Sequence, residues 1–297
     1  MTDRLTMQDP REQYAKPPFP KQPQPVPGLA AKMDPQPDHG ETSYKGSGRL
    51  AGRKALVTGG DSGIGRAAAI AYAREGADVA IAYLPGETTD AQDVIALIEA
   101  EGRTAVALPG DITDENWCKQ LVAAAVAGLG GLDILVINAG HQQARDSIAE
   151  VTSKDFDVTM KTNLYAMHWI TQAAVPHLKP GSAVITTASV QAYDPSANLL
   201  DYATTKAGIV AYTKALAKQL IEKGVRANVV APGPFWTALQ ASGGQPPEKV
   251  MTFGEQSAFG RPGQPVEIAP VYVLLASQEA SFTTGEIYGV TGGAGIA

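Results

Sequence analysis

From about residue 53 to the C-terminus, short β-branched runs alternate with longer alanine-rich segments, and this alternation restricts the possible folds more than any other feature. The runs predict seven strands, at Lys54–Thr58, Asp78–Ala82, Thr104–Leu108, Asp133–Asn138, Ala183–Ser189, Val225–Val230 and Ile287–Thr291. The segments predict six helices, at Ile64–Arg74, Thr89–Ala100, Glu115–Ala127, Ser153–His177, Tyr202–Ile221 and Val266–Ala276. Strands that alternate with helices form a parallel sheet covered on both faces. Right-handed crossovers then give a doubly wound α/β fold of the Rossmann type, with a seven-stranded parallel sheet.

The first 48 residues have a different composition. They contain nine of the 21 prolines, at 10, 17, 18, 20, 23, 25, 27, 35 and 37. Proline fixes φ and lacks an N–H donor, so we expect an extended arm with neither helix nor central strand. Two interpretations stay open, a disordered tail and an arm docked on the body or on a neighbouring subunit. Apolar side chains spaced along the arm favour docking: Tyr14, Phe19, Leu29, Met33 and Tyr44. The expected division is an arm over residues 1–48 and one dinucleotide-binding and catalytic domain over 49–297.

Charge and composition exclude several classes of protein. The chain has 24 Lys and Arg against 30 Asp and Glu, a net charge of −6, and no basic tract, so we expect no nucleic-acid partner. No apolar run approaches the ~20 residues that span a bilayer, so we expect no membrane partner. Residues 1–10 lack the apolar segment of a secretory signal, and we expect a cytoplasmic protein. Cys118 is the single cysteine, and the four histidines lack metal-ligand spacing, so we expect no metal.

A glycine-rich turn follows the first predicted strand and opens the first predicted helix. It reads Thr58-Gly59-Gly60-Asp61-Ser62-Gly63-Ile64-Gly65. Glycines allow a tight turn and a close approach of the backbone to a pyrophosphate, and a helix N-terminus offers free N–H groups to that anion. A plain strand–helix connection is the alternative, but the position after the first strand of a βαβ unit favours a dinucleotide site. Arg66 follows Gly65, so the turn lacks the lysine of an NTPase P-loop.

Three residues form a candidate catalytic set. Tyr202 and Lys206 are four residues apart on a predicted helix, which places them on one face. A nearby ammonium favours the phenolate, so we expect Lys206 to lower the pKa of Tyr202 and to fit it for proton transfer at a carbonyl or alcohol oxygen. Ser189 is predicted to end the fifth strand, at the sheet edge where ligands bind, where its hydroxyl can stabilise the same oxygen. A surface contact is the alternative for an isolated Tyr–Lys pair.

From about residue 50 to its end, the chain resembles a short-chain dehydrogenase/reductase. The matching pieces occur in the family's order and spacing: Thr58–Gly65, Asn138-Ala139-Gly140, Asn163, Ser189, Tyr202, Lys206 and Pro232-Gly233. The arm resembles that of a bacterial subgroup related to glucose and ribitol dehydrogenases.

The resemblance implies a role for each matching residue. Tyr202 is then the general acid/base, Ser189 polarises the substrate oxygen, and Asn163 belongs to a proton relay that also includes Lys206. Lys206 also binds the nicotinamide ribose. The resemblance further implies a nicotinamide coenzyme, NAD(P)(H), and a homotetramer in which the helices at 153–177 and 202–221 pair. Residues that would bind the coenzyme are Gly59, Asp61, Ser62, Gly63, Ile64, Gly65, Tyr83, Asp111, Ile112, Asn138, Ala139, Gly140, Tyr202, Lys206, Pro232, Gly233 and Thr237.

The choice between NAD and NADP depends on the end of the second strand. An acidic residue there binds the adenosine ribose, and a basic one accepts a 2′-phosphate. This strand runs Ala80-Ile81-Ala82-Tyr83 and lacks the acidic residue, but no Lys or Arg lies between Glu75 and Glu101. The local charge favours NAD over NADP. Asp111 and Ile112 resemble the residues that contact adenine, and an N-cap-like turn is the alternative for Asp111.

The sequence therefore predicts an oxidoreductase that moves hydride between nicotinamide and the carbon of a carbonyl or alcohol. We expect the stretch 232–263, which breaks the strand–helix rhythm, to form a mobile substrate loop. Candidate pocket residues are His141, Gln142, Gln143, Val190, Gln191, Tyr193, Phe235 and Trp236; Trp117, Trp169 and Cys118 are expected in the core. The mixture of apolar and amide groups fits a sugar, polyol, aldehyde or ketone. A non-catalytic dinucleotide sensor or scaffold is the alternative, since a fold alone does not establish catalysis. A nucleotide-sugar epimerase is a third hypothesis. Such an epimerase normally needs a longer C-terminal substrate domain than the six residues that follow Thr291.

Overall fold

The computed structural model describes residues 4–296 and shows one seven-stranded sheet in which every pair of neighbours is parallel. The strand order is β3-β2-β1-β4-β5-β6-β7, the doubly wound order in which the chain runs outward from β1 to β3 and then crosses back to β4 on the other side of β1. The strands are β1 (Lys54–Thr58), β2 (Asp78–Tyr83), β3 (Ala105–Pro109), β4 (Ile134–Ile137), β5 (Ala183–Thr187), β6 (Arg226–Pro232) and β7 (Ile287–Val290). The predicted fold class is confirmed.

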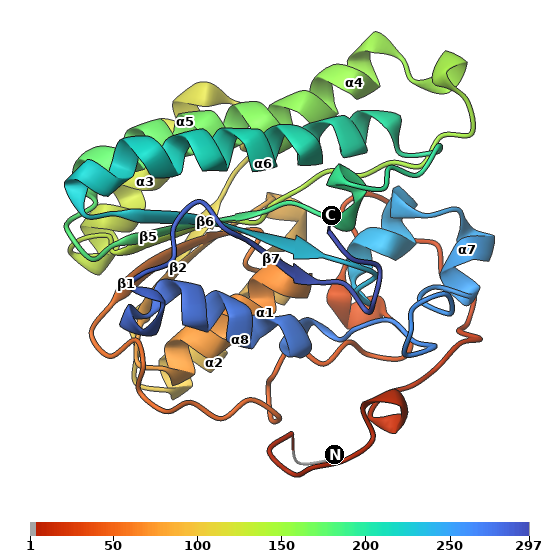
Figure 1. The fold of residues 1–297 in the computed structure, drawn as a ribbon, viewed down its shortest axis with the longest axis horizontal. Coiled ribbons are helices and arrows are strands. Elements are labelled where there is room, and N and C mark those ends of the chain that lie inside the picture. The colour runs from red at the N-terminus through yellow and green to blue at the C-terminus, as the bar shows by residue number, and fades with distance from the viewer. Residues whose placement is uncertain (1–3, 297) are drawn as a thin grey trace.

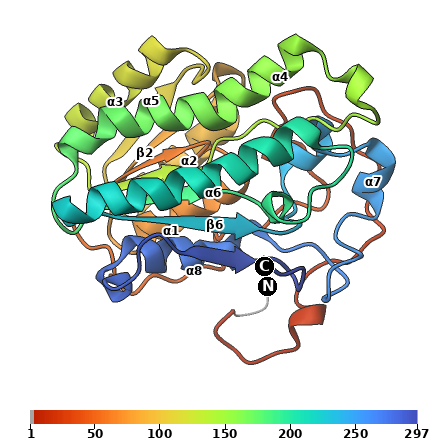
Figure 2. The same ribbon diagram turned by 45° about the horizontal axis from the view of Figure 1, so that its top comes forward.

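Helices cover both faces of the sheet, as Figures 1 and 2 show. One layer holds α1 (Gly63–Arg74), α2 (Thr88–Ala100) and α8 (Pro265–Ala276). The other holds α3 (Glu115–Leu129), α4 (Ser153–Met160), α5 (Ala166–Ala174) and α6 (Leu200–Leu220). Every residue of β4, β5 and β6 is buried, because these strands contact helices on both faces, whereas the edge strands β3 and β7 are partly exposed. A short helix, α7 (Pro247–Met251), interrupts the predicted loop.

The single helix predicted over 153–177 is divided into segments. The π-helical turn Lys161–Tyr165 separates α4 from α5, and a 3-10 turn, Val175–His177, follows α5. A π turn interrupts the regular helical hydrogen bonds and is frequent at functional sites. Pro176 lacks an N–H and cannot continue the α-helical pattern, which explains the end of α5.

Two predicted boundaries near the candidate catalytic residues were displaced. Strand β5 ends at Thr187, so Ser189 lies two residues beyond it and precedes the 3-10 turn Val190–Ala192. Helix α6 begins at Leu200, so Tyr202 lies inside its first turn. Both residues remain at the carboxyl edge of the sheet, where the displaced boundaries do not alter their proximity.

The proline-rich arm lies against the body of the protein, as the docked interpretation predicts (Figure 1). Phe19 and Met33 are 4% and 2% exposed and form a small apolar cluster with Trp236, whose ring centre lies 4.2 Å from that of Phe19. Tyr44 is buried in the main core, and its hydroxyl donates to Glu75 over 2.7 Å. The expectation of no helix was wrong for two 3-10 turns, Pro10–Glu12 and Ala30–Lys32. The first turn begins with Pro10. The N–H of the first residue in a helix has no partner within the helix, so a proline at that position costs no hydrogen bond.

Candidate active site

The turn between β1 and α1 is built for close approach of a ligand to the backbone. Gly59 and Gly63 have φ values of +64° and +52°, in the left-handed region that favours glycine. A Cβ on Gly65 would lie 1.9 Å from the carbonyl oxygen of Gly59, so only glycine allows α1 to pack on the turn. Ser62 precedes α1, and its side chain makes no capping hydrogen bond. The first N–H groups of α1 therefore remain available to an anion.

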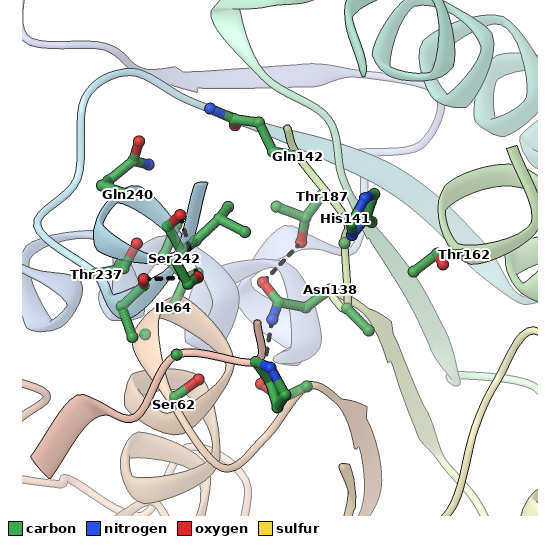
Figure 3. Close-up of a pocket in the computed structure, with 18 of the residues that line it drawn as sticks. Ser62, Ile64, Asn138, His141, Gln142, Thr162, Thr187, Thr237, Gln240 and Ser242 are labelled. Carbon is green, nitrogen blue, oxygen red and sulfur yellow. Dashed lines mark hydrogen bonds between the residues drawn. The ribbon is translucent and has the colours of Figure 1, made fainter. Parts of the chain in front are cut away.

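A cavity of about 510 Å³ extends from this turn to the candidate catalytic residues. Figure 3 shows Ser62 and Ile64 of the α1 turn among the residues that line this cavity, together with Asn138, Thr187 and Thr237. The predicted coenzyme-binding residues that line it are Gly59, Asp61, Ser62, Gly63, Ile64, Tyr83, Asp111, Ile112, Asn138, Ala139, Gly140, Tyr202, Lys206, Pro232, Gly233 and Thr237. Gly65 does not line the cavity; it lies behind the turn and allows its close packing. The glycine turn and the open helix end fit the pyrophosphate of a dinucleotide.

Tyr202 and Lys206 both line the cavity from the first turns of α6. The Lys206 nitrogen lies 5.2 Å from the centre of the Tyr202 ring and donates to the carbonyl oxygen of Thr187 over 2.8 Å. Burial lowers the pKa of Lys206 to about 7. Burial also raises the pKa of Tyr202 to about 12, although a hydrogen bond with Ser189 acts in the opposite direction. The expected lowering of the Tyr202 pKa is therefore wrong, because loss of hydration on burial outweighs the hydrogen bond with Ser189.

Ser189 lines the cavity beside Tyr202 and is 7% exposed. Its hydroxyl accepts a hydrogen bond from the backbone N–H of Gln191 over 3.2 Å, which orients it at the start of the 3-10 turn. The hydroxyl also interacts with Tyr202. A substrate oxygen placed between these two hydroxyls would be within reach of both a proton donor and a second hydrogen-bond donor.

Asn163 lies in the π turn and does not line the cavity. Its side chain forms a clamp: Oδ1 accepts from the backbone N–H of His141 over 2.7 Å, and Nδ2 donates to the carbonyl oxygen of His141 over 3.0 Å. Nδ2 also donates to Thr205 of α6 over 2.9 Å. The π turn thus joins the segment after β4 to the helix that carries Tyr202 and Lys206, and this link was not predicted from the sequence.

Two carboxyl groups lie at the end of the cavity near β2. Asp61 is 2% exposed, and its Oδ2 has no hydrogen-bond partner. Burial raises the pKa of Asp61 to about 6. Burial and the neighbouring charge of Asp61 raise the pKa of Glu87 to about 8, while its carboxyl accepts from the backbone N–H of Leu84 over 3.0 Å. These carboxyls can accept hydrogen bonds from ribose hydroxyls. A basic residue would be expected to bind the 2′-phosphate of NADP, and the described residues that line the cavity include no arginine.

Only some of the predicted substrate-contact residues line the cavity. His141 and Gln142 line the cavity, as do Val190, Gln191 and Phe235. Gln143, Tyr193 and Trp236 do not; Trp236 is fully buried beneath the arm and donates from Nε1 to the carbonyl oxygen of Pro35. Asp111 lines the cavity, and its side chain accepts from the backbone N–H of Thr113, as in the N-cap-like turn; its contact with adenine stays a prediction. As expected, Cys118 is fully buried and Trp117 and Trp169 pack on the core.

Several cavity residues were not predicted from the sequence. The most distant are Val26, Pro27 and Gly28 of the arm, which no local motif distinguishes. Others come from the stretch after β6, including Leu239, Gln240 and Ser242, two of them labelled in Figure 3. Across residues 4–296, no cluster of three or more potential ligands could hold a metal ion. In the same part of the chain, no helix is both long enough and apolar enough to cross a membrane.

Comparison with known proteins agrees with this geometry. The family model described as enoyl-(acyl carrier protein) reductase matches residues 59–295. An uncharacterized oxidoreductase of Escherichia coli, YghA, is 60% identical over 97% of this chain and 98% of its own. The chloroplastic NADPH-dependent aldehyde reductase 1 of Arabidopsis thaliana is 41% identical over 90% of this chain and 95% of its own.

A solved structure extends the comparison to the fold. The crystal structure of a short-chain dehydrogenase from Burkholderia cenocepacia in complex with NADP is 35% identical, with a TM-score of 0.77, and the match covers 83% of this chain and 99% of that one. A matching family model, relatives aligned over almost their full length and the parallel sheet with its glycine turn lead to one conclusion. The chain belongs to the short-chain dehydrogenase/reductase family of oxidoreductases.

Proposed function

We propose that this protein interconverts a carbonyl and an alcohol with a nicotinamide coenzyme, and that Tyr202 is the general acid/base. The observation that carries the proposal is the convergence of Tyr202, Lys206 and Ser189 in the cavity that begins at the glycine turn. The bound coenzyme supplies or accepts the hydride. The turn at Gly59–Ile64 would hold its pyrophosphate, and Pro232, Gly233 and Thr237 would contact its nicotinamide end.

In the reducing direction, the Tyr202 hydroxyl gives its proton to the substrate oxygen. A pKa of about 12 keeps this proton in place at neutral pH before reaction. The Ser189 hydroxyl donates a second hydrogen bond to the same oxygen and stabilises the charge that develops there. Lys206 is held by Thr187 at a fixed place beside the phenol, and in its charged form it stabilises the phenolate that remains.

Asn163 supports this arrangement from outside the cavity. Its clamp on His141 and its bond to Thr205 connect the segment after β4 with α6. We propose that Asn163 takes part in the proton relay from Lys206 to solvent, as the family resemblance implies. The positions of the two side chains support this role, because both lie close to Gly140. A Cβ built on Gly140 would be 3.6 Å from Asn163 Oδ1 and 3.7 Å from Lys206 Nζ.

Tyr202→Phe tests the proposed reaction. The variant keeps the aromatic ring and loses the transferable proton, so turnover should fall by at least about 10³-fold while coenzyme affinity stays within about twofold. Purified protein would be assayed with both coenzymes against sugars, polyols, aldehydes and ketones, with coenzyme binding followed by calorimetry. Turnover at the native rate would contradict the role of Tyr202. A native protein that binds coenzyme but turns over none of these classes would favour the dinucleotide sensor instead.

We propose a preference for NAD over NADP. In the cavity, the carboxyl groups of Asp61 and Glu87 would lie next to the 2′-phosphate that distinguishes NADP. The NADP bound in the similar Burkholderia structure and the name of the Arabidopsis relative support NADP. The ratio of the two dissociation constants distinguishes them. If the carboxyls determine the preference, native protein binds NAD more tightly, and Asp61→Asn improves affinity for NADP more than for NAD.

The substrate class follows from the cavity wall and the relatives. Val190 and Phe235 supply apolar surface, while His141, Gln142 and Gln191 supply hydrogen-bonding groups. We propose a small aldehyde or sugar carbonyl as substrate, and the name of the aldehyde reductase relative supports the aldehyde.

Three further proposals concern the whole protein. We propose a homotetramer that pairs through α4, α5 and α6, since Tyr165 beside α5 and Leu200 on α6 are 49% and 42% exposed apolar side chains. Sedimentation as a monomer would contradict it. We also propose a cytoplasmic location. Finally, we propose a division into an arm (residues 1–48) and a catalytic domain (49–297). Removing the arm would test whether the catalytic domain folds by itself.

A further inference from the structure

The arm contributes a wall to the proposed coenzyme cavity. Val26, Pro27 and Gly28 line the same cavity as Gly59 and Tyr202, although they lie more than 30 residues away along the chain. They belong to a turn that the Gln24 side chain closes: its Oε1 accepts from the backbone N–H of Leu29 over 2.9 Å, and its Nε2 donates to the carbonyl oxygen of the same residue over 3.2 Å. The turn therefore has a defined shape of its own.

This turn is attached to the body at its C-terminal side by Asp90 of α2. Asp90 is fully buried, and its carboxylate accepts from the backbone N–H of Ala30 over 2.6 Å and of Ala31 over 3.4 Å. Pro27 lies beside the segment after β2, since a Cβ built on Gly86 would be 3.5 Å from Pro27 Cγ. One side of the turn is thus fixed at the cavity end that holds Asp61 and Glu87.

The other side of the turn is attached to the stretch after β6. The backbone N–H of Gln24 donates to the carbonyl oxygen of Ala241 over 2.9 Å. Gly28 is packed so closely that a Cβ would lie 2.8 Å from the carbonyl oxygen of Ala238 and 2.9 Å from Ser242. Ala238 and Ser242 themselves line the cavity. The arm therefore bridges two parts of the cavity wall, the segment after β2 and the stretch after β6.

We infer that residues 24–31, here called the strap, retain the coenzyme by joining α2 to the loop at 232–263, with Asp90 as the positioning residue. This inference rests on the proposed function, because it assigns the cavity to a coenzyme. Val26 is 54% exposed at the cavity wall and supplies apolar surface for a bound coenzyme to cover. With the strap attached, the loop stays against the body and the coenzyme leaves slowly. With the strap released, the loop and the cavity wall separate.

Variants of Asp90 test the strap in the full-length protein. Asp90→Ala removes both the charge and the acceptor, whereas Asp90→Asn removes the charge and keeps an amide oxygen for Ala30. Asp93→Ala on the same helix is the control, because Asp93 is exposed and the change in charge is the same. We expect Asp90→Ala to raise the dissociation rate of reduced coenzyme at least about tenfold, Asp90→Asn to restore most of the native rate, and Asp93→Ala to match native protein.

A second measurement does not depend on the coenzyme. Hydrogen exchange of the amides at 236–251 in the free protein should be faster in Asp90→Ala than in Asp93→Ala. Equal dissociation rates for Asp90→Ala and Asp90→Asn would attribute the effect to charge and overturn the strap. Native exchange of the loop in Asp90→Ala would also overturn it. A native protein that binds neither NAD(H) nor NADP(H) would instead contradict the proposed function, and the exchange measurement would still decide whether the strap holds the loop.

Discussion

The side-chain nitrogen of Lys206 lies 5.2 Å from the centre of the Tyr202 ring, and both side chains are almost completely buried. Burial acts against the charged form of each, which raises the pKa of the tyrosine to about 12 and lowers that of the lysine to about 7. At neutral pH the site therefore holds a neutral phenol beside an amine whose charge changes near that pH. This is a costly arrangement for folding and a useful one for proton transfer.

Replacing Lys206 with methionine should stabilise the free protein while removing activity. The pKa of lysine falls from its ordinary value of 10.5 to about 7 on folding, so the cost of the buried ammonium is complete below pH 7 and disappears as the pH rises toward 10.5. We expect Lys206→Met to raise the free energy of unfolding by about 2 kcal/mol at pH 6, a gain reduced by the lost bond to Thr187.

Denaturant unfolding at pH 6 and pH 10 measures this effect. Lys214→Met, an exposed position on the same helix, is the control and should change stability little at either pH. A loss of stability in Lys206→Met at pH 6 would contradict the expected cost of the buried charge.

Glu87→Gln should make stability less dependent on pH. Folding raises the pKa of Glu87 from 4.5 to about 8, so the native state binds its proton more tightly and loses stability as the pH rises through this window. The glutamine is neutral throughout and can still accept from Leu84. We expect the variant to match native protein at pH 4.5 and to be more stable by about 2 kcal/mol above pH 8. Glu99→Gln, exposed on α2, controls for the loss of a surface charge.

Gly65→Ala should disrupt the turn that opens α1. The new Cβ would lie 1.9 Å from a backbone oxygen of Gly59, and no rotation of a side chain can relieve that contact. We expect a loss of at least about 3 kcal/mol of stability, or failure to fold, as for other severe overpacking. Gly86→Ala serves as a control, since its Cβ would make only an ordinary 3.5 Å contact. Thermal unfolding of the two variants compares them, and similar melting temperatures would show that the turn can rearrange.

Phe19→Ala should measure how much the docked arm contributes to stability. The ring is 4% exposed and packs against Trp236, so its removal leaves a cavity between the arm and the loop. We expect a loss of about 3 kcal/mol and a change in Trp236 fluorescence. Leu5→Ala is the control within the arm, because Leu5 is 76% exposed. An unchanged unfolding free energy in Phe19→Ala would mean that the arm docks without stabilising the body.

Local sequence patterns were enough to predict the order of strands and helices along the chain, the glycine turn, and the placement of Tyr202 and Lys206 on one helical face. These features depend on local periodicity and on backbone restrictions that neighbouring residues impose. Even the displaced limits of β5 and α6 left Ser189 and Tyr202 at the same edge of the sheet.

Contacts between residues far apart in the chain became known only from the packing of the folded protein. This packing placed Val26–Gly28 in the cavity wall, Trp236 beneath Phe19 rather than in the cavity, and Asn163 on the backbone of His141. It also reversed the expected shift of the Tyr202 pKa. Contacts of this kind depend on how separate elements pack, and a pKa depends on how completely that packing removes water, neither of which a local pattern of residues specifies.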